Sequence, residues 1–269
     1  MSRYSWKAVL ITGASSGLGR GLAEVLAAPG VTLHLSGRDA ARLEGAAQAC
    51  RARGATVAAR VLSVTDAPAM AAWIAGAGRL DLVIANAGIS GGTGDAVEGA
   101  AQALRIFATN LGGVLNTALP AIEAMATQAP GADGVRGRVA VVASLAAFVA
   151  SPSAPAYCAS KAAVQRWAEA LDASERKRGI RLHAVCPGFI RTPITAQNPF
   201  AMPGLMTPEQ AAIRMLDGIA AGRLRVTFPW RLYAMSRIVG ALPPRWRNAL
   251  MGRLPAKPPA DQVPRSAGG

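Results

Sequence analysis

The chain is poor in several residue types, and each scarcity excludes a class of protein. Its three cysteines, Cys50, Cys158 and Cys186, are odd in number and have no Cys-x-x-Cys spacing, which argues against a disulfide framework and favours a reducing compartment, the cytoplasm. Its two histidines, His34 and His183, have no clustered partners, so we expect no metal site. No apolar run is long enough to span a bilayer, and the first one is too short for a secretory signal.

Acidic residues are scarce as well. The chain has 15 aspartates and glutamates against 29 lysines and arginines, which gives a formal net charge of +14. Such an excess invites a nucleic-acid interpretation, but the basic residues are mostly scattered, and aromatic residues that could stack on bases make up only 5% of the chain. We therefore expect no nucleic-acid partner.

Basic residues are densest near the C-terminus. The segment from Arg223 to Lys257 holds eight basic residues and no acidic one. This mixture of apolar and cationic residues fits a peripheral contact with anionic lipid, at the inner face of the membrane. The alternative is that the aromatic residues pack over a cleft or a subunit interface while the arginines stay solvated. The large apolar residues of the segment are Phe228, Trp230, Leu232, Tyr233, Met235, Ile238, Val239, Leu242 and Trp246.

A glycine-rich segment near the N-terminus has the pattern of a nucleotide-binding turn. Residues 12–19 read TGASSGLG, directly after the apolar run Ala8 to Ile11 and before a helical pattern that contains Leu22, Val25 and Leu26. Glycines let a backbone approach a pyrophosphate closely, and the amides at a helix N-terminus favour its negative charge. An ordinary glycine-rich loop would look similar, but its position in the first βαβ unit favours a dinucleotide site.

A tyrosine, a lysine and a serine have the spacing of a proton-transfer site. Tyr157 and Lys161 are four residues apart, on one helix face. The lysine ammonium can lower the pKa of the tyrosine hydroxyl, which is ordinarily about 10, and so favour acid/base exchange near neutral pH. Ser144 closes an apolar run upstream and could orient a carbonyl oxygen by hydrogen bonding. Alone, the tyrosine–lysine pair also fits a solvated helix pair, so the prediction depends on the other motifs.

Taken together, these motifs resemble the short-chain dehydrogenase/reductase family over residues 5 to 228. The resemblance also includes Asn86-Ala87-Gly88 after a strand, Asn110 in a helix, and Pro187-Gly188 in the stretch that ends at Thr192. It implies a Rossmann-like domain that binds NAD or NADP, with Tyr157 as acid/base and Ser144 positioning the carbonyl. It further implies that Lys161 holds the nicotinamide ribose and lowers the tyrosine pKa, and that Asn110 holds a water in a proton relay. Thr192 matches the position that contacts the nicotinamide carboxamide.

The chain departs from the family pattern at two positions. Ala85 stands where the family often has a first asparagine before Asn86, a change that affects adenosine packing only. Ser63 stands where an aspartate commonly meets the adenine amino group. The adenine contacts are therefore less well defined by the motif.

The end of the second predicted strand indicates which cofactor is bound. An NAD enzyme usually has an acidic residue there to hold the ribose hydroxyls, whereas this chain has Arg38, which can bind a 2′-phosphate. Arg38 could also merely cap a loop, and Asp39 would be the ribose ligand if the register were shifted. We expect NADP(H) in preference to NAD(H). The expected cofactor-binding residues are Gly13, Ser15, Ser16, Gly17, Leu18, Gly19, Ser36, Arg38, Ser63, Val64, Asn86, Ala87, Gly88, Tyr157, Lys161, Pro187, Gly188, Ile190 and Thr192.

Alternating helical and β-branched segments predict one α/β domain over residues 1–254: a doubly wound, parallel, seven-stranded Rossmann-like sheet between two helical layers. We expect a substrate lid at about 192–210, a C-terminal helical extension at about 229–254 and a disordered tail at 255–269. The expected strands lie near 7–12, 31–36, 56–62, 81–85, 138–143, 180–185 and 224–228.

These features predict an oxidoreductase that interconverts a ketone and a secondary alcohol. The apolar lid, with Phe148 and Val149 as a further wall, favours a lipophilic or acyl-type substrate. The alternative is a catalytically silent nucleotide-binding regulatory or scaffold protein of the same fold, although such a protein has no chemical need for Ser144, Tyr157 and Lys161 together. By resemblance we expect a homodimer or homotetramer built from helices near 96–126 and 156–178.

Overall fold

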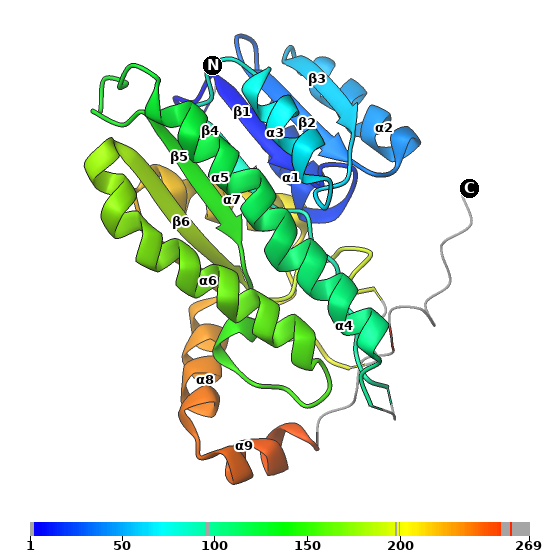
Figure 1. Ribbon diagram of the computed structural model, residues 1–269. Helices are drawn as coiled ribbons and strands as arrows, with labels where there is room; N and C mark the ends of the chain where they lie inside the picture. Colours follow the sequence, from blue (N-terminus) through cyan, green and yellow to red (C-terminus); the bar gives the residue numbers. More distant parts are fainter. Residues whose placement is uncertain (1–2, 95–96, 197, 199, 254–258, 260–269) are drawn as a thin grey trace.

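A seven-stranded parallel sheet forms the centre of the computed structural model, which describes residues 3–94, 97–196, 198, 200–253 and 259. The strands run in the order β3-β2-β1-β4-β5-β6-β7, and every neighbouring pair is parallel (Figure 1). This confirms the predicted doubly wound sheet, and β6 extends beyond its predicted end. The strands are β1 (Ala8–Thr12), β2 (Thr32–Gly37), β3 (Thr56–Val61), β4 (Leu82–Ala85), β5 (Gly137–Val142), β6 (Ile180–Pro187) and β7 (Arg225–Phe228).

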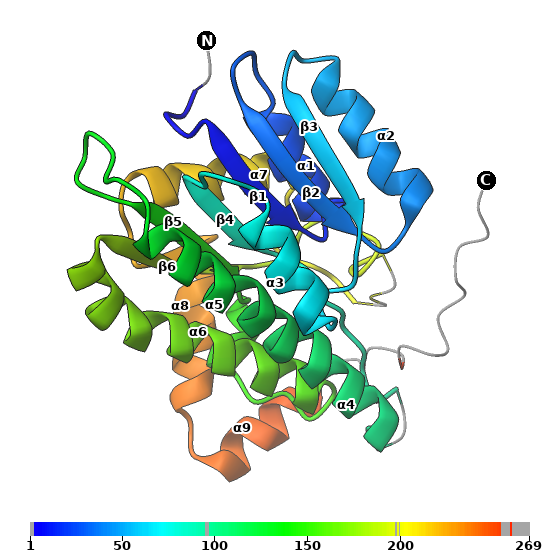
Figure 2. The same ribbon diagram turned by 45° about the horizontal axis from the view of Figure 1, so that its top comes forward.

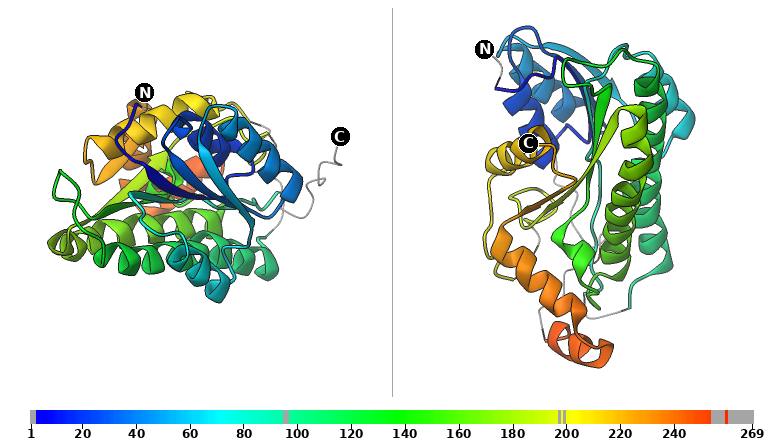
Figure 3. Two further views of the ribbon diagram at one scale, coloured as in Figure 1. Left: turned by 90° about the horizontal axis from the view of Figure 1, so that it is seen from above. Right: turned by 90° about the vertical axis from the view of Figure 1, so that its left-hand side faces the viewer.

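Helices cover both faces of the sheet, as the view from above makes plain (Figure 3). One layer contains α1 (Gly17–Leu26), α2 (Ala40–Arg51) and α7 (Pro208–Ala220). The other contains α3 (Ala67–Ala75), α5 (Gly113–Ala126) and α6 (Pro155–Glu175), and α4 (Ala100–Phe107) leads into α5 through the π-helical turn η1 (Ala108–Gly112). The predicted three-layer arrangement is therefore confirmed.

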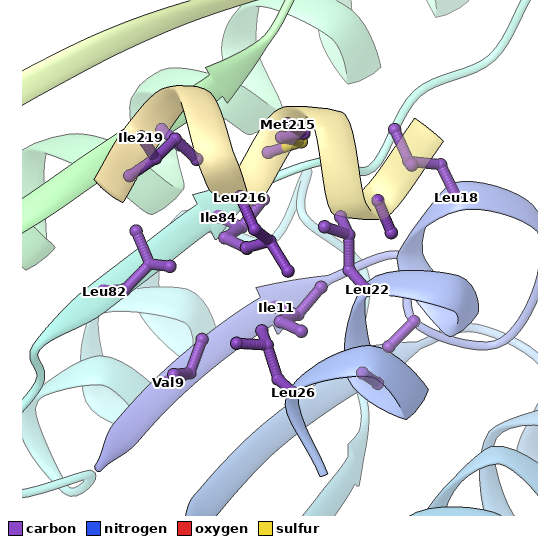
Figure 4. Close-up of a cluster of buried hydrophobic side chains, with 14 of the residues drawn as sticks. Val9, Ile11, Leu18, Leu22, Leu26, Leu82, Ile84, Met215, Leu216 and Ile219 are labelled. Atoms are coloured by element: carbon purple, nitrogen blue, oxygen red, sulfur yellow. The ribbon is translucent and has the colours of Figure 1, made fainter. Parts of the chain in front are cut away.

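The core is divided by the sheet, because alternate residues of a strand point to opposite faces. On β1, Val9 and Ile11 pack with α1 and α7, whereas Leu10 packs with α3 and α5. Figure 4 shows the first of these clusters, where Leu22 of α1 and Leu216 of α7 meet above the sheet. Because both faces of β1 and β4 are buried at the centre of the sheet, these two strands are almost entirely apolar in sequence.

After β7 the chain forms two further helices, α8 (Trp230–Ala241) and α9 (Pro244–Met251), within the predicted 229–254 extension. They extend beyond the sheet at the lower end of the molecule in Figure 2. No helix in the described part of the chain is both long and apolar enough to cross a membrane. The predicted disordered tail at 255–269 lies outside the described residues, apart from Pro259.

Candidate active site

A cavity of about 700 Å³ lies at the carboxyl ends of the strands, across the point where the strand order reverses between β1 and β4. In open α/β sheets, ligands bind in this position. Most of the predicted cofactor and catalytic residues line it: Gly13, Ser15, Ser16, Gly17, Leu18, Arg38, Ser63, Val64, Asn86, Ala87, Gly88, Ser144, Tyr157, Lys161, Pro187, Gly188, Ile190 and Thr192.

The glycine-rich turn after β1 has no room for side chains at its key positions. Gly13 has a positive φ of 67°, and a Cβ added there would lie 2.8 Å from the Cα of Ala87. At Gly19, an added Cβ would lie 2.2 Å from the carbonyl oxygen of Gly13. The residue before α1, Ser16, makes no side-chain capping hydrogen bond in the described structure. The first amides of α1 therefore face a cradle of bare backbone, which fits a pyrophosphate.

Asn86 joins the carboxyl ends of β1 and β4. Its side-chain amide donates to the carbonyl oxygen of Thr12 at 2.9 Å, and its backbone amide donates to the Thr12 hydroxyl at 3.1 Å. The Thr12 hydroxyl also accepts from the amide of Ala87 at 3.2 Å. Asn86 thus fixes the loop that carries Gly88 into the cavity wall, a structural contribution beyond the lining role predicted for it.

The two candidate ribose-end ligands after β2, Arg38 and Asp39, have different environments. Asp39 caps α2, because its carboxylate accepts from the backbone amide of Arg42 at 2.9 Å and from the Arg42 side chain at 2.6 Å. These hydrogen bonds hold the pKa of the Asp39 carboxyl below its usual range. Arg38 is exposed, lines the cavity and has no carboxylate within ion-pair distance among the described residues. An anion entering here meets a guanidinium that no carboxylate neutralises.

Ser144, Tyr157 and Lys161 come together on one wall of the cavity. Ser144 follows β5 and precedes the 3-10 turn η2 (Leu145–Phe148), and its hydroxyl accepts from the backbone amide of Ala146 at 3.1 Å. Lys161 lies one turn after Tyr157 on α6, with its ammonium 5.9 Å from the centre of the tyrosine ring. The same ammonium donates to the carbonyl oxygen of Val142 at 2.8 Å. The three side chains have the relative placement that proton transfer to a carbonyl oxygen requires.

Burial controls the ionisation of this group. It raises the pKa of the Tyr157 hydroxyl above its ordinary value, and the nearby Ser144 hydroxyl offsets only part of the rise. Burial also lowers the pKa of Lys161 to about 8. The expected lowering of the tyrosine pKa by Lys161 is therefore not found in the chain by itself, since both groups lose hydration.

Asn110 lies in η1, where the helix widens to a π-helical turn. Its side-chain oxygen accepts from the amide of Ile89 at 2.8 Å, and its side-chain amide donates to the Ile89 carbonyl and to the Ser160 hydroxyl. π-helical turns are frequent at functional sites. Asn110 is buried behind Gly88 and does not line the cavity, so its relay role stays a prediction.

Some expected residues lie elsewhere, and others were missed. Ser36, one of the expected cofactor-binding residues, is fully buried, its hydroxyl has no partner among the described residues, and it does not line the cavity. Gly19 lies behind the turn. Phe148 packs edge-on against Tyr233 of α8 instead of forming a wall of this cavity. The cavity residues without a motif signal include Arg42, Thr65, Ile89, Arg105 and Thr109, whereas Ile194 and Thr195 belong to the predicted lid segment.

No group of three or more metal-ligating side chains occurs in the described ranges. His183 is buried in β6, where its Nδ1 lies 2.7 Å from the carbonyl oxygen of Arg223, and burial lowers its pKa to about 4. His34 lies partly buried in β2, far from it in the strand order. Both histidines occupy the strand positions predicted for them.

Comparison with known proteins gives consistent matches. The model of the short chain dehydrogenase family matches residues 7–201, more than half of the chain. An uncharacterized oxidoreductase of Myxococcus xanthus is 38% identical over 259 residues, which covers 94% of this chain and 100% of the relative. A protein of Mycobacterium tuberculosis, "Probable oxidoreductase EphD", is 33% identical over 95% of this chain, but this chain spans only 41% of that protein. A Streptomyces violaceoruber protein named as a ketoacyl reductase of the granaticin polyketide synthase is 32% identical over 80% of this chain and 79% of the relative.

Solved structures match the fold. A short-chain dehydrogenase of Sphingobium yanoikuyae, in complex with NADPH, aligns with a TM-score of 0.76 and 24% identity over 98% of both chains. A short-chain dehydrogenase/reductase of Burkholderia phymatum, in complex with NAD, has the same TM-score and identity over 96% of this chain and 99% of its own.

Proposed function

Because the chain belongs to the short-chain dehydrogenase family of oxidoreductases, we propose that it uses NADP(H) to interconvert a ketone and a secondary alcohol, acting on the CH–OH group. The observation that carries this proposal is the placement of Ser144, Tyr157 and Lys161 on one wall of the cavity that begins at the glycine-rich turn. The bare backbone of that turn leaves room for a dinucleotide pyrophosphate.

Each side chain of the wall has a defined task in this proposal. Bound in the cavity, the nicotinamide cofactor supplies the hydride for reduction or accepts it in oxidation. The Tyr157 hydroxyl gives its proton to the carbonyl oxygen during reduction and takes the proton back in the reverse direction. Ser144 donates a hydrogen bond to the same oxygen, and Lys161, held by Val142, offers its remaining N–H groups to the ribose. Asn110 would support the water relay that resupplies the proton.

The preference for NADP(H) rests on the environment of Arg38 and Asp39. Asp39 is engaged by Arg42 and by the start of α2, whereas Arg38 is free to form charge-assisted hydrogen bonds with a 2′-phosphate. These two hydrogen bonds occupy one site on each carboxylate oxygen of Asp39 and leave fewer sites for ribose hydroxyls. Arg42 lines the same end of the cavity and adds positive charge there.

The proposed substrate is lipophilic or acyl-like. Two apolar residues directly after Thr192, Pro193 and Ile194, line the cavity. Phe189 and Phe200 pack edge-on with ring centres 6.2 Å apart, and a β-bridge between Ile190 and Met206 closes the base of the segment. The relative named as a ketoacyl reductase is consistent with a β-keto acyl chain as the substrate. The predicted lid at 192–210 overlaps the first residues of α7.

We also propose that the protein works in the cytoplasm as a homo-oligomer. Leu104 and Phe107 of α4 and Leu119 of α5 are exposed large apolar residues on the helices named for this contact. Exposed apolar residues on adjacent helices favour an interface between subunits. The choice between dimer and tetramer follows from sedimentation of the purified protein.

The competing proposal is a catalytically silent nucleotide-binding protein. Binding and turnover separate the two. We would titrate the purified protein with NADPH and NADH, following nucleotide fluorescence, and then screen medium- and long-chain ketones and secondary alcohols. Tight NADPH binding with turnover supports the oxidoreductase, binding without turnover of any substrate supports the silent protein, and binding of neither nucleotide overturns both.

A further inference from the structure

The helices α8 and α9 form an extension that the proposed chemistry does not use. The extension starts at the carboxyl end of β7, and α8 packs against η2 (Figures 1 and 3). The cis peptide bond between Phe228 and Pro229 turns the chain into α8. Beyond α8, the chain turns at Pro243 and α9 projects from the main body of the molecule.

The outer surface of the extension carries large apolar side chains. Trp230 and Ile238 of α8 are 70% and 67% exposed, and Trp246 of α9 is 72% exposed. Met235 and Leu250 are exposed as well. On α9, Trp246 and Leu250 are four residues apart and so share one helix face. Two exposed tryptophans on neighbouring helices indicate a surface that binds a partner.

The same two helices, and the turn after α9, also carry cationic side chains. Arg231, Arg245 and Arg253 are exposed and Arg247 is half-buried, and none of them has a carboxylate within ion-pair distance among the described residues. Some arginines elsewhere, such as Arg178, pair with acidic neighbours, whereas others, such as Arg38, do not. The Arg231 guanidinium lies 5.6 Å from the centre of the Trp230 ring. Apolar rings interspersed with unpaired guanidinium groups match the chemistry of a phospholipid headgroup layer.

From these observations we propose that α8 and α9 dock on an anionic lipid surface. The two tryptophans enter the headgroup layer, where such amphipathic rings are favoured, and the unpaired arginines bind lipid phosphates. A second copy of this chain is a poor occupant, since an isologous contact would place arginines against arginines with no acidic residue between them. An acidic protein surface would satisfy the same groups, and an absence of binding to anionic vesicles is the outcome that would favour it.

Docking on lipid would bring the cavity close to substrates dissolved in the membrane. This inference rests on the proposed reaction with a lipophilic ketone. A Cβ added at Gly188 in the cavity wall would lie 3.0 Å from Leu232 of α8, so the docking helix begins beside the cavity. Phe148, four residues after Ser144, packs against Tyr233 of α8, and the Tyr233 hydroxyl accepts from Arg225 at 3.0 Å and from Arg237 at 3.1 Å. A lipophilic ketone dissolved in the bilayer would therefore reach the cavity over a short path.

Vesicle sedimentation tests the docking. The full chain would be incubated with vesicles of phosphatidylcholine alone or with one quarter phosphatidylglycerol, and the bound fraction measured after centrifugation. We expect binding to the anionic vesicles only, lost at high salt. The Arg245→Ala/Arg247→Ala double variant should bind about 30-fold more weakly, and Trp246→Ala should also weaken binding. Turnover of a water-soluble substrate without vesicles should stay unchanged in all variants, so that failure of docking is distinguishable from failure of the proposed function.

The matched control removes the same charge at another site. Arg51→Ala/Arg53→Ala alters two exposed arginines on and just after α2 and should bind vesicles as the wild type does. Equal weakening in the control and test variants would attribute binding to the net charge of +14 and overturn the proposal. The proposal would also be overturned if the wild type failed to bind anionic vesicles. It would be overturned as well if the wild type self-associated and Trp246→Ala abolished that self-association.

Discussion

The ammonium of Lys161 donates a hydrogen bond to the carbonyl oxygen of Val142, the last residue of β5, over 2.8 Å. This bond ties α6 to the carboxyl edge of the sheet and holds the lysine within the wall that contains Tyr157. The lysine is only 4% exposed. The charged ammonium of Lys161 therefore loses hydration when the chain folds, and this loss can be measured as a pH dependence of stability.

The first prediction concerns the pH dependence of stability. Burial lowers the pKa of Lys161 from 10.5 to about 8 in the folded chain, so the unfolded chain binds the proton more tightly between these values. The contribution of Lys161 to the free energy of unfolding therefore rises with pH in this window. Urea titrations without nucleotide measure the free energy of unfolding of both proteins. The value for the wild type minus the value for Lys161→Met should rise by about 2 kcal/mol from pH 8 to pH 10. A constant difference would contradict the burial of a charged lysine.

The second prediction concerns cofactor choice. Arg38→Ala should raise the Kd for NADPH by about 10- to 100-fold, the usual worth of hydrogen bonds to a charged group, with little change for NADH. Titration of both nucleotides measures the two constants. The matched control, Arg51→Ala, removes an exposed arginine of α2 that pairs with Glu44 away from the cavity, and it should change neither constant. An equal loss for both nucleotides would show that Arg38 does not bind the 2′-phosphate.

The third prediction concerns the contact between α8 and the loop after Ser144. Replacing a glycine inside a helix by alanine ordinarily stabilises the protein by about 0.5–1 kcal/mol. At Gly240, however, the added Cβ would lie 1.8 Å from the carbonyl oxygen of Phe148. Gly240→Ala should therefore lower the free energy of unfolding by about 2 kcal/mol and reduce kcat by displacing η2.

Gly45 of α2 provides the control for this substitution, because an added Cβ there meets nothing within 4 Å. Gly45→Ala should stabilise the protein and leave kcat unchanged. If both variants are stabilised alike in thermal melts, α8 does not pack on η2 as the structure has it.

Much of the site is visible in the sequence because its residues belong to local patterns. Strands such as β1 and β4 are short apolar runs, the turn at 12–19 is a contiguous motif, and Tyr157 and Lys161 are one helical turn apart. Each of these signals depends on neighbours within a few residues.

Tertiary contacts explain what the sequence does not reveal. Asp39 is adjacent to Arg38, and only the folded chain reveals that its carboxylate is engaged by Arg42. Arg105 reaches the cavity because α4 lies beside it, and no motif marks that residue. Ser36 is buried because both faces of β2 are covered at that point, whereas Arg38, two residues later, lies beyond the end of the strand. The pKa of Tyr157 depends on burial, which a spacing argument omits.

The central claim is that Tyr157 transfers the proton in a nicotinamide-dependent reaction, and Tyr157→Phe tests it most directly. With the best ketone found for the wild type, kcat at saturating NADPH should fall by about 10²- to 10⁴-fold in the variant, the usual contribution of a general acid. The Kd for NADPH should change by less than about threefold, because the aromatic ring keeps its place in the wall. A variant that keeps the wild-type kcat would contradict the catalytic role of Tyr157.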